Sequence, residues 1–224
     1  MPNKMRVLIL ISAVFFIHTA FSSDTTKFKT FFKIGPGLAY HGGLEEFNDL
    51  LSNNAVSKIA PSSFSSLIQG KIQRNNASYQ LSFSINNLNN RSSLPQTQVI
   101  FNLYHFSLNY GTDLLKSNDQ FRLEPFIGLG GTFGDFFVFS SDTLQSTNQV
   151  LDGAQNLYYE QPKLALIAES GIRCEYAAMG KRMGYFAELN AIVQFNDWNW
   201  QIENMVLNKL SVLRFNIGFR FKLF

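Results

Sequence analysis

The segment that most constrains the fold of this chain is its C-terminal stretch 209–224, in which apolar and polar side chains alternate. A period of two residues predicts a β-strand with one apolar and one polar face. In a soluble protein the apolar face packs into a core, whereas in a membrane barrel it contacts lipid and the polar face lines the lumen. The strand alone is compatible with both arrangements. Its apolar members are Leu210, Val212, Phe215, Ile217, Phe219, Phe221 and Leu223, and its polar or small members are Ser211, Arg214, Asn216, Gly218, Arg220 and Lys222.

The N-terminus has the pattern of a secretory signal peptide. A start that contains Lys4 and Arg6 precedes an apolar run that is too short for a spanning helix. The triplet Ala20-Phe21-Ser22 has small residues at the two positions that cleavage requires, so we predict cleavage after Ser22. A buried N-terminal strand is the alternative. The expected organisation is a signal peptide at 1–22 and one domain at 23–224.

Phenylalanine is unusually abundant, with 23 in 224 residues. No segment after the signal peptide is continuously apolar for the ~20 residues that a membrane helix needs. Hydrophobicity that is abundant but diluted by alternation is what a membrane β-barrel requires, because each strand shows lipid only every second residue.

Charge and cysteine content argue against several classes of function. Of the 19 lysines and arginines, Lys4 and Arg6 lie in the signal peptide, and the remaining 17 nearly balance the 16 acidic residues, which gives no support for nucleic-acid binding. The single cysteine, Cys174, excludes an internal disulfide framework, and the spacing around it does not suggest a metal site. We therefore expect no metal and no other cofactor.

Eight segments alternate as strands do, and polar segments connect them. A short amphipathic helix is expected at Leu44–Leu51, inside the first long connection. Pro36, with glycines on both sides, predicts a bend or bulge in the first strand. The expected strands cover residues 27–40, 65–73, 79–86, 98–111, 120–130, 162–176, 185–195 and 209–224.

Connections one, three, five and seven are the longer ones, and connections two, four and six are brief. An outer-membrane up-and-down barrel has long external loops and short periplasmic turns in alternation. The sequence therefore predicts an all-β, eight-stranded, antiparallel, up-and-down transmembrane β-barrel in the cell outer membrane, with both ends of the chain in the periplasm. Outer-membrane lipid is the expected surrounding of its apolar face.

The polar faces of the strands carry charges of both signs. Because a barrel of eight strands is just wide enough for side chains to fill, we predict a lumen closed by an ionic network and not an open pore. The alternative is a lipocalin-like soluble barrel, with the phenylalanines inside and the charges in water. The expected lumen residues are Arg122, Glu124, Glu169, Arg173, Glu175, Glu188, Arg214 and Arg220, with Lys222 at the end of the series.

The chain resembles the PorT-like outer-membrane β-barrel domain family, the small barrels related in shape to OmpA and OmpX. The resemblance rests on the signal peptide, on the stretch LEPFIGLGG at 123–131 and on FNIGFRF at 215–221, and it covers nearly the whole mature chain as a pattern. It implies a role in protein secretion or at the cell surface, without a shared catalytic activity.

The resemblance also implies that the terminal aromatic residue, Phe224, is read by the barrel-assembly machinery through the C-terminal strand. In such signals the terminal aromatic is in phase with the lipid-facing set. Here Phe219, Phe221 and Leu223 are out of phase with Phe224 by one residue. A bulge near the end of the strand, or a position of Phe224 beyond the membrane, accounts for this difference.

One possible catalytic group lies in the fourth strand, where His105 and Ser107 share a face. The spacing resembles the His and Ser of lipid A deacylases, and Glu124 on the next strand is placed to orient the imidazole. Because the apolar face of that strand is the opposite one, we expect a lumenal pair bonded to its neighbours and no enzyme. The alternative is a membrane-embedded lipid-modifying enzyme.

Three functions remain open at this point. The first is binding of a protein partner through the long loops at 41–63 and 140–160, as part of a secretion or surface assembly. The second is the membrane enzyme, and the third is a soluble periplasmic barrel that binds a hydrophobic ligand. Aromatic residues at strand ends are expected to form girdles at the headgroups, namely Tyr158, Tyr159, Trp198 and Trp200.

Overall fold

The fold is described from a computed structural model of the whole chain. The predicted signal peptide at 1–22 lies outside the part of the chain that the structure describes. The described residues are 28–53, 58–89, 97–115, 120–140, 158–160, 164–177, 182–196, 198–199, 206–207 and 209–223.

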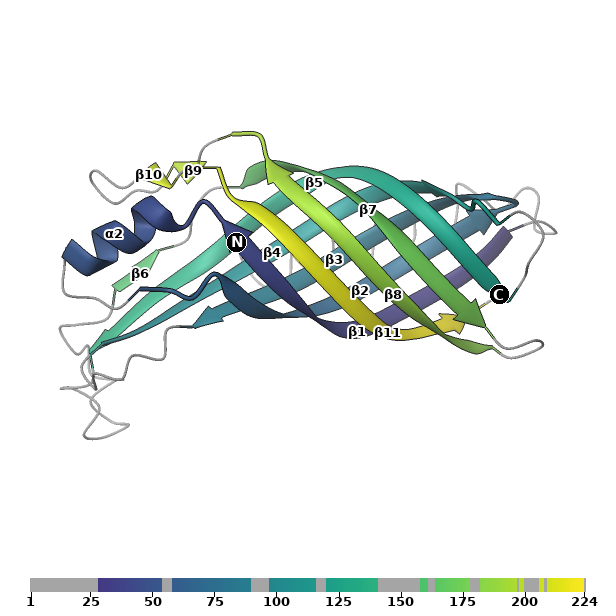
Figure 1. Ribbon diagram of the computed structural model, residues 1–224, viewed down its shortest axis with the longest axis horizontal. Helices are drawn as coiled ribbons and strands as arrows, with labels where there is room; N and C mark the ends of the chain where they lie inside the picture. Colours follow the sequence, from purple (N-terminus) through teal and green to yellow (C-terminus); the bar gives the residue numbers. More distant parts are fainter. Residues whose placement is uncertain are drawn as a thin grey trace, which may run out of the picture.

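Eight long antiparallel strands form a closed barrel with its strands running obliquely to the long axis (Figure 1). Each strand pairs with its neighbour in sequence, β11 pairs with β1, and the pairing of β4 with β5 completes the ring. The predicted eight-stranded up-and-down barrel is therefore confirmed. The strands are β1 (Phe28–Gly42), β2 (Ser62–Arg74), β3 (Ala77–Asn89), β4 (Thr97–Thr112), β5 (Phe121–Ser140), β7 (Ala165–Ala177), β8 (Met183–Gln194) and β11 (Ser211–Lys222).

The two ends of the barrel differ in their connections. At the end that we call the turn end, β2 passes into β3 through Asn75 and Asn76, and Asn75 has a φ of 53°, a conformation that asparagine tolerates. The residues 113–120 and 178–182 connect strands at the same end. At the opposite end, which we call the loop end, residues 43–61, 90–96, 141–164 and 195–210 connect the strands. The segment 90–96 is no longer than 113–120, so connection length separates the two ends less strictly than predicted.

The alternation seen in the sequence becomes a division between the inside and the outside of the barrel. On β8, for example, Phe186, Glu188 and Asn190 are buried, whereas Tyr185 and Leu189 are exposed on the outer surface. The C-terminal strand departs from the prediction at one point, because Leu210 and Val212 face inward while Leu213 faces outward. Near the loop end the interior is thus apolar, and both faces of the strand carry apolar residues.

Pro36 does not produce the predicted bulge. The register between β1 and β11 is the same on both sides of it, with Ile34 opposite Phe219 and Gly37 opposite Asn216. The pairing is only interrupted at Gly35 and Pro36, where proline has no N–H to donate. A Cβ at Gly35 would lie 2.0 Å from the carbonyl oxygen of Ile217, so the two backbones approach too closely for any other residue.

Among the described residues, the loop end carries one helix and three short strands in addition to the barrel (Figure 1). Helix α2 (Glu45–Asn53) matches the helix predicted at Leu44–Leu51. Gly43, with a φ of 84°, turns the chain from β1 into this helix. The predicted loops at 41–63 and 140–160 are shorter than expected, because their first and last residues belong to strands. The short strands are β6 (Tyr158–Glu160), which pairs with β5, and β9 (Trp198–Asn199) and β10 (Val206–Leu207), which pair with each other.

Candidate functional site

The outer surface of the barrel is apolar and its interior is polar. Ile127 and Leu129 on β5 are each 67% exposed, whereas their neighbour Glu124 is completely buried. This arrangement is the reverse of the lipocalin-like alternative, in which the apolar faces would point inward.

Aromatic side chains mark both edges of the apolar surface. Tyr79 and Tyr110 lie near the turn end with ring centroids 5.4 Å apart, and Tyr185 and Phe219 lie 5.6 Å apart at the same end. Near the loop end, Tyr104 on β4 stacks on Phe133 of β5 at 5.0 Å. We infer that these residues contribute to the girdles. The girdle role of Tyr158 and Tyr159 in β6 and of Trp198 in β9 stays a prediction, and Trp200 lies outside the described residues. Exposed aromatic residues also include Tyr40, Phe64, Phe121, Tyr176 and Phe195.

The half of the lumen nearer the turn end is filled by a cluster of ion pairs. Glu124 accepts hydrogen bonds from Lys71 Nζ at 2.6 Å, Arg173 Nη1 at 2.6 Å and Ser78 Oγ at 2.7 Å. Glu175 accepts a hydrogen bond from Lys71 at 2.8 Å and pairs with Lys33. Lys71 thus joins two carboxylates, and each carboxylate is held by more than one cation.

A second set of polar groups continues the network toward the loop end. Glu188 accepts a hydrogen bond from Arg173 Nε at 2.6 Å and from Gln69 at 3.1 Å. Glu169 accepts one from Arg214 Nη2 at 2.9 Å and also bonds to Ser107 and Asn190. Because Arg173 bonds to both Glu124 and Glu188, it connects the two halves of the lumen.

All eight residues that the sequence assigned to the lumen face the interior and are at least nine-tenths buried. Three further charged residues take part that sequence reasoning did not include. Lys33 and Lys71 are completely buried in the ion-pair cluster, and Asp113 follows β4 and accepts a 2.8 Å hydrogen bond from Arg122 Nε. The strand period identifies Lys33 and Lys71 as inward-facing, since they alternate with Phe32 and Ile72, whereas Asp113 lies beyond the last strand residue and carries no such signal.

Between the network and the loop end lies a band of buried side chains that contain polar atoms without a hydrogen-bond partner among the described residues. His105 is 5% exposed, and both of its ring nitrogens lack a partner. His41 Nε2 contacts Ser63 Oγ at 2.9 Å, but its Nδ1 is unpaired. Buried polar groups of this kind are usually paired with ordered water. Four other buried polar atoms also lack a hydrogen-bond partner among the described residues, namely Asn86 Nδ2, Asn86 Oδ1, Thr132 Oγ1 and Gln194 Oε1.

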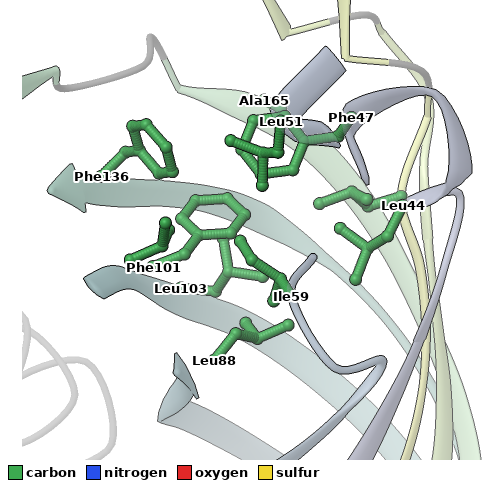
Figure 2. Close-up of a cluster of buried hydrophobic side chains, with 11 residues drawn as sticks. Leu44, Phe47, Leu51, Ile59, Leu88, Phe101, Leu103, Phe136 and Ala165 are labelled. Atoms are coloured by element: carbon green, nitrogen blue, oxygen red, sulfur yellow. The ribbon is translucent and has the colours of Figure 1, made fainter. Parts of the chain in front are cut away.

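Above this band an apolar cluster closes the loop end of the barrel, and helix α2 forms part of it (Figure 2). Phe47 of the helix packs edge-on against Phe136 with ring centroids 5.3 Å apart and lies 6.0 Å from Phe101. Asn48 fixes the returning chain, because its side chain both accepts a 2.7 Å hydrogen bond from Ile59 N and donates one of 3.0 Å to Ile59 O. The cluster contains Leu44, Phe47, Leu51, Ile59, Leu88, Val99, Phe101, Leu103, Phe136, Ala165 and Leu210.

Among the described residues there is no group of three or more His, Cys, Asp or Glu side chains that could hold a metal ion. Cys174 is a free, half-buried thiol. Helix α2 lacks the length and the apolar composition to cross a membrane.

Comparison with known proteins shows similarity in structure alone. No protein-family description matches the sequence, and no curated protein matches it. The attachment invasion locus protein Ail of Yersinia pestis superposes with a TM-score of 0.53 at 11% identity, over 88% of this chain and 100% of that one. Neisserial surface protein A superposes with a TM-score of 0.51 at 12% identity, over 87% of this chain and 97% of that one. A major outer membrane protein of Thermus thermophilus gives a TM-score of 0.53 at 11% identity, over 87% and 99% of the two chains.

The chain has the fold of a small outer-membrane β-barrel. At these identities the likeness extends to the fold and not to a role, so the expected kinship with OmpA and OmpX is supported in shape, and membership of the PorT-like family stays a prediction. What the barrel does must be argued from its own residues.

The possible catalytic residues of the barrel are not arranged as a nucleophile with a base. Ser107 and His105 share the inner face of β4, but Ser107 donates its hydrogen bond to Glu169 and not to His105. Glu124 is engaged by Lys71, Arg173 and Ser78, so it does not orient the imidazole as the sequence suggested. All three residues are buried in the lumen, away from the apolar surface where a lipid substrate would lie.

Two further predicted features lie wholly or partly outside the described residues. Phe224 is one of them. Phe219 in β11 and Leu223 directly after β11 are exposed on the outer surface. Most of the loop at 140–160 is the other. The loop at 41–63 is described except for 54–57. Its helix α2 presents Glu45 and Asp49 to solvent.

Proposed function

We propose that this protein is an outer-membrane β-barrel with a closed lumen, and that its loop end binds a partner protein in a secretion or surface assembly. The observation that carries membrane insertion is the apolar outer surface between two aromatic girdles, around a charged interior. Water would not solvate such a surface, whereas outer-membrane lipid matches it. The predicted signal peptide supplies the route of export.

The orientation follows from the connections and from the chain ends. Thr30 O accepts a 2.9 Å hydrogen bond from Leu223 N, so the beginning and the end of the barrel domain lie together at the turn end. We place the turn end in the periplasm, where the barrel-assembly machinery reads the C-terminal strand and Phe224. The loop end then faces the outside of the cell.

Because side chains fill the lumen, we do not propose transport through the barrel. The ion pairs of Glu124, Glu169, Glu175 and Glu188 fill the middle, and the apolar cluster with α2 fills the loop end. The solvent-facing side of α2 remains exposed at the loop end. It carries Glu45 and Asp49 and is held in place by Phe47 and Asn48.

Membrane insertion is tested by cell fractionation followed by gel mobility with and without boiling. We expect recovery in the outer membrane and a mobility that changes on heating, because folded membrane barrels resist detergent until they are heated. Release into the soluble periplasm without detergent contradicts the proposal and makes binding of a hydrophobic ligand the leading function.

Partner binding is tested by replacing residues 141–157 with a short Gly-Ser linker and, separately, by reversing Glu45 and Asp49 to lysine. Both variants should assemble and keep their heat-dependent mobility, but should lose a protein that is cross-linked to the wild type on the cell surface. A matched control replaces Lys209, which is exposed at the same end, with glutamate. If both loop-end variants keep the same cross-linked protein, the partner-binding part of the proposal is wrong.

A further inference from the structure

Exposed charges are distributed unevenly between the ends of the barrel. Among the described residues, every exposed charged side chain at the turn end is basic, whereas the loop end exposes both acidic and basic side chains. The acidic ones include Glu45 and Asp49. The turn end therefore presents a positive surface to an approaching solute. Its exposed basic residues are Lys29, Arg74, Arg182 and Lys222.

Three of these four residues come from consecutive parts of the barrel wall at the turn end, in β1, in β11 and directly before β8, and we place them around the mouth of the lumen. Lys222 on β11 pairs with Phe31 of β1, and Lys29 precedes Phe31 by two residues, so it has the same inward phase. Arg182 precedes β8, and its carbonyl oxygen accepts a 2.7 Å hydrogen bond from Lys222 N. Arg74 differs, because it has the outward phase of β2 and lies over the ring of Phe28.

Just inside this mouth, Arg220 is buried but incompletely paired. It is 7% exposed and lies on the ring of Phe31, with its guanidinium carbon 4.0 Å from the ring centroid. Its nearest acidic contact is Glu175 Oε2, at 3.4 Å from Nε. Neither Nε nor Nη1 has a hydrogen-bond partner within the described part of the chain.

The pairing of the buried charges accounts for this position of Arg220. Arg122 pairs with Asp113, and Arg214 pairs with Glu169, so these two pairs are internally balanced. Three buried carboxylates then remain for four basic side chains. The fourth of these, Arg220, has only the long contact to Glu175, which Lys33 and Lys71 already engage. The carboxylates are Glu124, Glu175 and Glu188, and the cations are Lys33, Lys71, Arg173 and Arg220.

We propose that the mouth at the turn end is an anion-binding site for a phosphate group. The guanidinium of Arg220 has two donors without a hydrogen-bond partner, Nε and Nη1, on different edges of the planar group, and a charged N–H donor forms a strong hydrogen bond to a phosphate oxygen. The exposed side chains of Lys29, Arg182 and Lys222 surround it and add positive charge. A bound phosphate gives Arg220 the close counter-charge that it lacks, since its contact with Glu175 is 3.4 Å long.

The site is independent of the partner proposed for the loop end, since it lies at the opposite end of the barrel. A phosphate group can come from a soluble phosphate compound or from the headgroup of an anionic lipid in the leaflet that the turn end faces. The chemistry is the same in both cases, and the experiment separates them.

The first test titrates inorganic phosphate into the folded full chain in a neutral detergent, at constant ionic strength maintained with chloride, and follows 31P NMR line broadening and the melting temperature. We expect saturable binding that raises the melting temperature. The double variant Arg220→Gln/Lys222→Gln should bind about tenfold more weakly or worse, because charge-assisted hydrogen bonds are lost. The matched control Lys58→Gln/Lys209→Gln removes the same charge at the loop end and should bind as the wild type does.

If the Arg220 variant fails to fold, Arg182→Gln/Lys222→Gln tests the same site without changing a buried side chain. Absence of saturable binding to the wild type, or an equal loss in the control, overturns the proposal. Phosphatidylglycerol that competes with inorganic phosphate identifies a lipid headgroup as the natural source, and phosphatidylglycerol that does not compete identifies a soluble phosphate; the site stands in both cases. A chain that is soluble without detergent contradicts membrane insertion but leaves this titration valid.

Discussion

Lys71 Nζ on β2 lies 2.6 Å from Glu124 Oε2 on β5, and these strands are not neighbours in the barrel. Between them lie β3 and β4, so this ion pair crosses the lumen and does not run along its wall. Lys33 on β1 reaches Glu175 on β7 in the same way. The network therefore holds opposite walls together and occupies the space through which a solute would have to pass.

The first prediction concerns this crossing pair. Lys71→Met leaves Glu124 and Glu175 with fewer cations in a site that is fully buried, and removal of one partner of a buried pair costs about 3 kcal/mol. We expect a loss of that order in the free energy of unfolding, measured by urea titration of the barrel in lipid vesicles. Lys58→Met breaks the exposed pair with Asp49, whose side chains are 59% and 72% exposed, and should leave stability unchanged.

The double variant Lys71→Met/Glu124→Gln provides a second check on the same pair. Removal of both charges should recover part of the stability that Lys71→Met loses, because no unpaired carboxylate remains at that point. If the two residues did not interact, the losses caused by Lys71→Met and by Glu124→Gln would add. The double variant would then be less stable than Lys71→Met by the whole loss that Glu124→Gln causes alone.

The second prediction concerns the outer surface. On β5, Ile127 lies halfway between Phe121, which is exposed near the turn end, and Phe133, which stacks on Tyr104 nearer the loop end. Ile127→Arg places a charge at the middle of the apolar surface and should destabilise the barrel in lipid by about 2–4 kcal/mol. Phe64→Arg, at the edge near the loop end, should cost about 1 kcal/mol or less. Equal effects at the two positions would contradict the assignment of this surface to lipid.

The third prediction concerns the closure of the loop end. Phe47→Ala removes the ring that packs on Phe136 and Phe101, and large-to-small changes of this kind cost about 3–5 kcal/mol. Because α2 contacts the barrel mainly through this face, we expect local opening: faster hydrogen exchange at 45–53 and faster tryptic cleavage after Lys58, with the barrel itself intact. Asp49→Ala, on the exposed face of the helix, should change neither rate.

The barrel could be predicted from the sequence because its signal is local. Alternation on each strand depends only on whether a residue faces lipid or lumen, so Tyr185 and Leu189 could be placed outside and Glu188 inside from the period of two alone. The charges of the lumen followed from the same period. Which charge pairs with which did not, because Lys71 and Glu124 meet only through the closure of the ring.

The loop end was less predictable for a related reason. The first half of β4 has apolar residues on both faces, which leaves its register open when the sequence is considered alone. In the structure Phe101 and Leu103 face inward and pack with Phe47 and Leu51 of α2 in one apolar cluster. The strand is regular, and its alternation is lost because both of its faces have apolar surroundings here. The amphipathic helix was expected, but its partners on β4 and β5 are distant in sequence.

The last prediction concerns the unpaired polar band between the ionic network and the apolar cluster. His105 is 5% exposed, and neither of its ring nitrogens has a hydrogen-bond partner among the described residues. A buried polar group without a partner costs about 1–3 kcal/mol, so His105→Leu, which keeps much of the side-chain volume, should stabilise the barrel by about 1 kcal/mol in urea unfolding. Ser107→Ala on the same strand should do the opposite, because it removes the hydrogen bond that the Ser107 hydroxyl donates to Glu169. If His105→Leu instead destabilises the barrel, an ordered water must pair with the imidazole in the native state. His105→Ala tests the enzyme alternative separately, and we expect it to leave lipid A acylation unchanged, since His105 does not bond to Ser107.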